Sequence, residues 1–212
     1  MHELENPSII HFPAMPIQGW NAVAKRAMDV AGVLLLMPLF GIPMLILAFL
    51  VKATSRGPIL LRQERIGLGG KKFTMLKFRS MHAEAEKQTG PVWTQKNDSR
   101  RTRLGVFMRR FSLDELPQLF NVLHGDMSLV GPRPERPHFL PELIHRFPHY
   151  MRRYDVKPGI TGWAQVSGLR GNTSVEKRLL HDLYYINNWC LKFDFYILLL
   201  TPVAGLMDSN AY

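Results

Sequence analysis

The sequence contains a single cysteine, Cys190, among its 212 residues. An internal disulfide and a cysteine-based metal cluster are therefore excluded, and the polar part of the chain is expected in a reducing compartment. Acidic residues are also scarce: 17 Asp and Glu oppose 27 Lys and Arg, which gives a formal net charge of +10. This positive excess indicates an anionic partner, which is nucleic acid, an anionic membrane surface or a phosphorylated substrate. Because 46% of the residues are hydrophobic, the chain can bury a core, and a wholly disordered basic chain is excluded.

Charge is absent altogether from residues 30–51. A helix over this run measures about 33 Å, which is enough for the hydrocarbon core of a bilayer. Pro38 and Pro43 lie inside the run, and Lys and Arg flank it on both sides. Symmetric basic flanks favour a re-entrant helix with both ends on the cytoplasmic face, and an ordinary single span is the alternative. We expect a flexible segment over 1–17 and a membrane-embedded helix over 18–52 that begins near residues 18–21.

Local patterns in the rest of the chain predict one short hairpin and several helices. Residues 59–66 and 71–78 alternate in strand fashion around Gly67-Leu68-Gly69-Gly70, which is typical of a β-hairpin. A phosphate-binding glycine loop is the weaker alternative, because no helix follows the glycines. Residues 82–100 are expected to form a polar loop. Thr173-Ser174-Val175-Glu176 is a capping box, which predicts a helix that continues to about Trp189.

Five arginines crowd residues 100–110, and an acidic pair, Asp114-Glu115, follows them. The arginines are typical of a solvated or headgroup-facing surface, or of a site that handles phosphate anions. Nucleic acid fits less well, because no aromatic stacking platform is interleaved with them. The segment Ser112-Leu113-Asp114-Glu115 is also a capping box, and acidic residues in a first turn stabilise a helix. The two carboxylates therefore stay open to a chemical or a purely structural role.

One further arginine, Arg133, lies between Pro132 and Pro134. The two prolines stiffen the backbone and hold the arginine in a fixed direction, which favours bidentate binding of a phosphate. An ordinary turn is the alternative interpretation.

Four stretches, in this order along the chain, together carry a family resemblance. They are Lys77-Phe78-Arg79-Ser80-Met81; Ser112-Leu113-Asp114-Glu115-Leu116-Pro117-Gln118-Leu119; Asn121-Val122-Leu123 with Gly125-Asp126-Met127-Ser128-Leu129-Val130-Gly131-Pro132-Arg133-Pro134; and Pro158-Gly159-Ile160-Thr161-Gly162-Trp163-Ala164-Gln165-Val166. The chain resembles the bacterial sugar transferases, which are monotopic phosphoglycosyl transferases, over residues 25–201.

Members of that family move a sugar-1-phosphate from a nucleotide diphosphate sugar to a polyprenyl phosphate at the cytoplasmic face of the bacterial inner membrane. The resemblance implies a UDP-sugar donor, undecaprenyl phosphate as acceptor, release of UMP, and initiation of exopolysaccharide or other glycoconjugate synthesis. It implies that Asp114 is the nucleophile of a covalent aspartyl intermediate, and that Glu115 and Asp114 hold Mg2+. The residues implied to bind substrate phosphate are Arg133, Lys77, Arg79, Arg110 and Arg170.

The expected fold is mainly α with a small β-hairpin: a single catalytic domain over 53–212, an N-terminal re-entrant membrane helix and interfacial amphipathic helices. The resemblance implies that the membrane helix is broken at Pro38. Met37 stands where the family usually has Ser, so the break rests on Pro38 alone or is shared with Pro43. Larger members carry an N-terminal bundle of spanning helices, and this chain resembles the minimal catalytic form.

Membrane lipid is an expected partner and nucleic acid is not, while a homo-oligomer and the identity of the sugar stay open. The alternative function is a non-catalytic basic scaffold at the membrane surface, within a glycan assembly complex. In that case Asp114-Glu115 would be no more than a helix cap.

Overall fold

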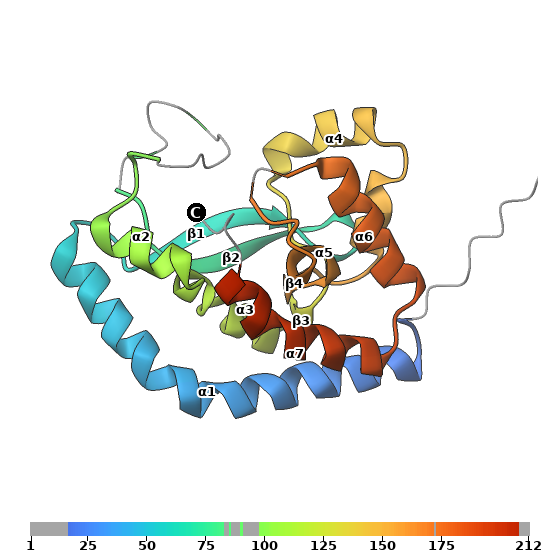
Figure 1. Cartoon of the computed structure of the whole chain (residues 1–212), viewed down its shortest axis with the longest axis horizontal. Helices are drawn as coiled ribbons and strands as arrows, with labels where there is room; N and C mark the ends of the chain where they lie inside the picture. The colour runs from blue at the N-terminus through green and yellow to red at the C-terminus, as the bar shows by residue number, and fades with distance from the viewer. Residues whose placement is uncertain (1–16, 83–84, 86–89, 91–97, 172, 208–212) are drawn as a thin grey trace, which may run out of the picture.

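One long helix forms the base of the molecule. In the computed structural model, which describes residues 17–82, 85, 90, 98–171 and 173–207, α1 (Trp20–Thr54) bows along one side. The other elements lie on the inner side of this bow (Figure 1). The further helices and strands are β1 (Leu60–Ile66), β2 (Lys72–Phe78), α2 (Arg103–Arg110), α3 (Gln118–His124), β3 (Ser128–Val130), α4 (Leu140–Arg146), β4 (Gly159–Thr161), α5 (Trp163–Val166), α6 (Val175–Asn187) and α7 (Leu191–Met207). The mainly α fold with a small hairpin is confirmed. The 1–16 segment and most of the 82–100 loop lie outside the described residues.

The helix α1 begins at Trp20, as its sequence predicts. It continues through Pro38 and Pro43 without the interruption that the family resemblance implies, and it bends instead (Figure 1). A proline inside a helix removes one backbone hydrogen bond and bends the axis, but it does not have to end the helix. Among the described residues, α1 alone is long and apolar enough to cross a membrane.

Both ends of α1 are fastened to the rest of the fold. Near its start, the buried Lys25 donates to Asp194 on α7, with a distance of 2.7 Å between Nζ and Oδ2. At its other end, the Arg79 guanidinium donates to the carbonyls of Ser55 at 2.7 Å and Arg56 at 2.8 Å. Between these two anchors, α1 exposes a series of large apolar side chains: Leu34, Leu35, Leu39, Ile42, Leu45, Ile46 and Phe49.

The predicted hairpin is confirmed. Strands β1 and β2 pair antiparallel, with a register from Leu60 opposite Phe78 to Ile66 opposite Lys72. The chain turns between them in a 3-10 turn, η1 (Leu68–Gly70), where Gly69 and Gly70 have positive φ angles of 65° and 75°. Positive φ is a conformation that glycine adopts without strain, which explains why glycines occupy this turn.

A second, parallel pair of strands was not expected from the sequence. Ser128 of β3 pairs with Gly159 of β4, and Val130 pairs with Thr161. The two backbones approach very closely: a Cβ on Gly159 would lie 2.0 Å from the backbone nitrogen of Gly131. Only glycine fits this contact, and it places the segment that follows β3 directly beside the start of β4.

The capping box near residue 173 is confirmed as a helix start but wrong in its register. Ser174, one residue later than the box requires, is the N-cap, and its side chain accepts from the backbone N–H of Lys177. Helix α2 is amphipathic, as expected of an interfacial helix, whereas α7 is apolar around its circumference, and both expose apolar side chains. These are Val106 and Phe107 on α2, and Phe195, Leu199 and Val203 on α7.

Candidate active site

The acidic pair lies in a short 3-10 turn, η2 (Leu113–Glu115), between α2 and α3. The predicted capping box is wrong, because Ser112 makes no side-chain cap and α3 begins only after Pro117. Ser112 has a φ of 54°, and it is the one non-glycine residue with a positive φ in the part of the chain that the structure describes. A side chain in this conformation is strained, and such strain concentrates at functional sites.

Glu115 is held by two cations. Its Oε1 accepts from Lys77 Nζ at 2.8 Å and from Arg133 Nη2 at 2.6 Å, and its Oε2 accepts from Arg133 Nη1 at 3.2 Å. Burial alone would raise the pKa of Glu115, but the charges and hydrogen bonds of Arg133 and Lys77 outweigh it and hold the pKa well below its usual value. Glu115 is therefore ionised, and its direction is fixed by a bidentate arginine.

Asp114, the next residue back, has the opposite environment. It is 5% exposed, and among the described residues no donor holds its carboxylate by a hydrogen bond or an ion pair. Burial raises the pKa of Asp114; the positive charge of Lys77 opposes this and the negative charge of Glu115 adds to it. A carboxylate without a bound donor keeps its lone pairs available, so Asp114 is a candidate oxygen nucleophile.

Sequence reasoning missed Arg109, which acts on Asp114 from α2. Burial lowers the pKa of Arg109 and the charge of Asp114 raises it, while its Nε donates to Ser80 Oγ at 2.8 Å. The neighbouring Arg110, which was predicted instead, is exposed and lies over the ring of Phe111 at 5.7 Å from its centroid. The helical period could have separated the two arginines, because Arg109 follows the buried Gly105 by four residues on one face.

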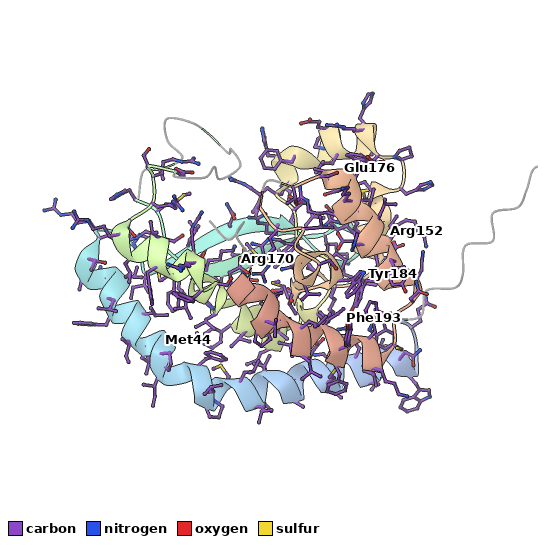
Figure 2. The ribbon with its side chains drawn as sticks, viewed as in Figure 1. Met44, Arg152, Arg170, Glu176, Tyr184 and Phe193 are labelled. Atoms are coloured by element: carbon purple, nitrogen blue, oxygen red, sulfur yellow. The ribbon has the colours of Figure 1, made fainter. Side chains whose placement is uncertain are left out.

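Two other predicted phosphate ligands have different positions. Arg79 lies beyond the last residue of β2, and its guanidinium is committed to the carbonyls at the end of α1, so the structure does not bring it to the acidic pair. Arg170 lies near the centre of the molecule (Figure 2), with Nη1 3.4 Å from the Oγ of Ser112. The structure thus brings Lys77, Arg133 and Arg170 to the acidic turn.

The acidic turn suits a divalent cation bound together with a substrate phosphate. Oε2 of Glu115 accepts one bond among the described contacts and retains a lone pair, and the neighbouring Asp114 carboxylate has no bound donor there. Mg2+ prefers such oxygens and usually binds through one or two carboxylates plus phosphate oxygens. No cluster of three or more His, Cys, Asp or Glu residues that would hold a metal by protein ligands alone occurs in the described part of the chain.

Comparison with known proteins identifies the family. The family model for the bacterial sugar transferases matches residues 20–208. Because this match covers almost the whole chain, the protein belongs to the bacterial sugar transferase family.

Several curated relatives are similar to this chain over most of its length. The UDP-glucose:undecaprenyl-phosphate glucose-1-phosphate transferase of Xanthomonas campestris pv. campestris is 49% identical over 195 residues, which cover 90% of this chain and 40% of that protein. The protein of the same name from Caulobacter vibrioides is 45% identical over 194 residues, which cover 89% of this chain and 72% of that protein. The UDP-N-acetylgalactosamine-undecaprenyl-phosphate N-acetylgalactosaminephosphotransferase of Aeromonas hydrophila is 41% identical over 203 residues, which cover 95% and 46%. The chain thus spans less than half the length of the Xanthomonas and Aeromonas relatives.

Proposed function

We propose that this protein transfers a hexose-1-phosphate from a UDP-sugar to undecaprenyl phosphate, through a covalent intermediate on Asp114. The observation that carries the proposal is the asymmetry of the acidic pair: Glu115 is held between Lys77 and Arg133, whereas the adjacent Asp114 is buried and has no bound donor in the described part of the chain. The names of the curated relatives support the donor and acceptor classes. The same turn lacks the helix-capping geometry that a purely structural role would require, which speaks against a non-catalytic scaffold.

The first half-reaction transfers the phospho-sugar to the enzyme. A carboxylate oxygen of Asp114 attacks the phosphorus that carries the sugar, and the bond from this phosphorus to the bridging oxygen breaks. UMP leaves with the bridging oxygen and its electron pair. Lys77, Arg109 and Arg133 supply three positive charges against two carboxylates, so the site has a net positive charge for the donor diphosphate.

The second half-reaction regenerates the carboxylate. A phosphate oxygen of undecaprenyl phosphate attacks the same phosphorus, the acyl–phosphate bond breaks, and Asp114 leaves as an ionised carboxylate. Dividing one displacement between two attacks uses the high reactivity of an acyl phosphate. Where Mg2+ is bound, Asp114 and Glu115 would hold it, and it would supply charge neutralisation at the phosphates.

The attachment of both α1 ends supports a location at one face of a membrane. Lys25 at the start of α1 and the carbonyls at its end both bond to one folded body, through Asp194 and Arg79 respectively. A helix that crossed the bilayer would have its ends separated by about 30 Å of hydrocarbon. These contacts favour a re-entrant helix with the catalytic domain at one face of the membrane. We propose that this is the cytoplasmic face, where undecaprenyl phosphate presents its headgroup.

The transfer reaction is tested with purified protein in nanodiscs that contain undecaprenyl phosphate. UDP-glucose, UDP-galactose, UDP-N-acetylglucosamine and UDP-N-acetylgalactosamine are supplied separately with Mg2+, and UMP and the lipid-linked sugar phosphate are quantified. We expect one hexose donor to give both products in equal amounts, and Asp114→Asn to give neither. Equal transfer by Asp114→Asn would contradict the role of Asp114, and no transfer from any donor would contradict the reaction.

A further inference from the structure

The turn that carries Arg133 has few backbone donors of its own, because two of its residues are prolines. Pro132 and Pro134 have no N–H group, so the residues on either side of Arg133 offer acceptors only. Four consecutive carbonyls of this turn accept hydrogen bonds from other parts of the chain. The bonds are Gly159 N to Pro132 O at 2.9 Å, Arg153 Nη2 to Arg133 O at 2.9 Å, Arg65 Nη1 to Pro134 O at 3.0 Å and Ile66 N to Glu135 O at 3.0 Å.

The side chain that donates to the Arg133 carbonyl is that of Arg153, and it is buried with a partner for each guanidinium nitrogen. Arg153 lies in the 3-10 segment η4 (Tyr150–Asp155), and only 4% of its side chain is exposed. Its Nε donates to Asp182 Oδ2 at 2.7 Å, its Nη1 donates to the hydroxyl of Tyr150, and its Nη2 donates to the Arg133 carbonyl. Each of the three guanidinium nitrogens therefore has a defined partner, and the group has a single orientation.

Stability alone does not explain this buried ion pair. The desolvation of two buried charges can exceed their mutual attraction, and well-packed apolar residues are often as stable in their place. What an apolar pair would not provide is a charged donor on the carbonyl of Arg133. That carbonyl belongs to the residue whose guanidinium binds both oxygens of Glu115.

Helix α6 reinforces the same turn at a second point. Asp182 and Arg178 are four residues apart, so they share one face of α6. Arg178 Nη1 lies 3.5 Å from Oε1 of Glu135, two residues after Arg133, while Asp182 orients Arg153 beneath the turn. One helix face thus contacts the turn both directly and through Arg153.

We propose that Arg153, oriented by Asp182, is a positioning residue that sets the direction in which Arg133 presents its guanidinium to Glu115. The inference rests on the proposed function, because it assigns catalytic importance to the geometry of Glu115. Arg153 does not touch the substrate, and it acts through the backbone of Arg133. A displacement of the Arg133 carbonyl also moves the Arg133 side chain, whose Nη2 lies 2.6 Å from Oε1 of Glu115.

A double-mutant cycle between residues 153 and 133 separates positioning from general stability. Arg153→Lys keeps the charge but loses the fork that serves Asp182 and the carbonyl together. It should lower kcat/KM for UMP release by about 10-fold, and in an Arg133→Lys background it should lower kcat/KM by less than about twofold.

A second variant and a control complete this test. Asp182→Asn, which keeps an acceptor oxygen, should lower kcat/KM by less than Arg153→Lys does, and its effect should also be smaller in the Arg133→Lys background. Arg152→Lys on the same segment is the matched control, because Arg152 contacts Asn187 at 3.2 Å near the edge of the molecule (Figure 2) and should leave kcat/KM unchanged.

A merely structural role gives a different result. Thermal unfolding would be affected by Arg153→Lys equally in both backgrounds, and kcat/KM would also fall by the same factor in both. Such additive losses, or full activity in Arg153→Lys, overturn the proposal.

A spectroscopic readout keeps this test independent of activity. The Nε–H resonance of Arg133, assigned by its disappearance in Arg133→Lys, is recorded with 15N-labelled arginine. We expect it to shift or broaden in Arg153→Lys and to stay unchanged in Arg152→Lys. An unchanged resonance in both overturns the positioning role, whereas the complete absence of UMP release by the parent enzyme overturns the proposed function alone.

Discussion

Asp114 and Glu115 are adjacent in one short turn, yet their carboxylates have opposite surroundings. Two cations lower the pKa of Glu115, while burial raises that of Asp114. Environments that move the pKa values of neighbouring carboxyls apart are typical of sites in which each group has a separate task. In the proposed reaction, Glu115 organises the cations and Asp114 is the group that attacks the phosphorus.

The raised pKa of Asp114 predicts a stability cost at neutral pH. The folded state binds the Asp114 proton more tightly than the unfolded chain does, so this contribution to stability is complete below the ordinary Asp pKa and is lost as pH rises through the folded pKa. Asp114→Asn removes the charge, and it should raise the stability of the fold at pH 7 while it abolishes transfer. Thermal unfolding in micelles, measured from about pH 4 to about pH 8, should show that the stability difference between variant and parent becomes smaller as the pH falls. A variant less stable than its parent at neutral pH would contradict this account.

The two neighbouring arginines at the end of α2 offer a matched comparison. Arg109 interacts with the charge of Asp114 from a half-buried position, whereas Arg110 is exposed over Phe111. Arg109→Gln should lower kcat by about 10- to 100-fold through loss of a charge that stabilises the transferring phosphate. Arg110→Gln, measured by the same UMP assay, should stay within about twofold of the parent, because an exposed charge is largely screened. Equal losses in both variants would show that only the total charge of α2 matters.

The outcome for single residues shows where sequence reasoning reaches its limit. Lys77 and Arg79 are two residues apart, so strand alternation would place both side chains on one face. Strand β2 ends at Phe78, however, and Arg79 leaves the ladder toward the end of α1. The αL conformation of Ser112 was equally invisible, because its sequence is that of a good helix cap.

At the scale of elements, local periodicity predicted what local forces determine. The apolar run of α1 and the alternation of the hairpin can be seen in consecutive residues. Both elements form where the sequence predicts them, although α1 is not broken at Pro38. The β3–β4 pair joins two three-residue strands that are about 30 residues apart along the chain, and it depends on the close approach of Gly131 and Gly159. Such a contact has no local sequence signal beyond the glycines themselves.

The anchoring of α1 predicts the sidedness of its two ends. Gln18 lies just before α1 and Leu68 lies in the hairpin turn, and both are exposed. In a Cys190→Ser background, Gln18→Cys and Leu68→Cys should react with an impermeant maleimide from the same face of inverted vesicles. Labelling of the two sites from opposite faces would show a true span.

The ion pair near the start of α1 also predicts a stability effect. A Lys25→Met variant, which leaves Asp194 buried without its cation, should lower the free energy of unfolding by about 3 kcal/mol.

At the scale of the whole molecule, the arrangement joins a membrane helix to a phosphate site within one body. Met44 of α1, which is labelled in Figure 2, packs into the same apolar cluster as Met108 of α2. Partly buried Leu113 and Leu116, on either side of the acidic pair, pack against that cluster. The acidic turn is therefore fixed relative to the helix that we place in the membrane. This arrangement would hold the nucleophile at the depth of a lipid phosphate, and the net charge of +10 favours an anionic membrane surface.

The covalent intermediate on Asp114 is the central claim, and a single-substrate experiment tests it most directly. The parent protein in nanodiscs without polyprenyl phosphate is incubated with Mg2+ and its UDP-hexose donor, and free UMP and the intact protein mass are measured together. The account predicts about one UMP released per active chain, with the mass of one phospho-hexose added at Asp114, and neither signal in Asp114→Asn. A folded enzyme that releases UMP only after undecaprenyl phosphate is added, and that never carries the adduct, would contradict it.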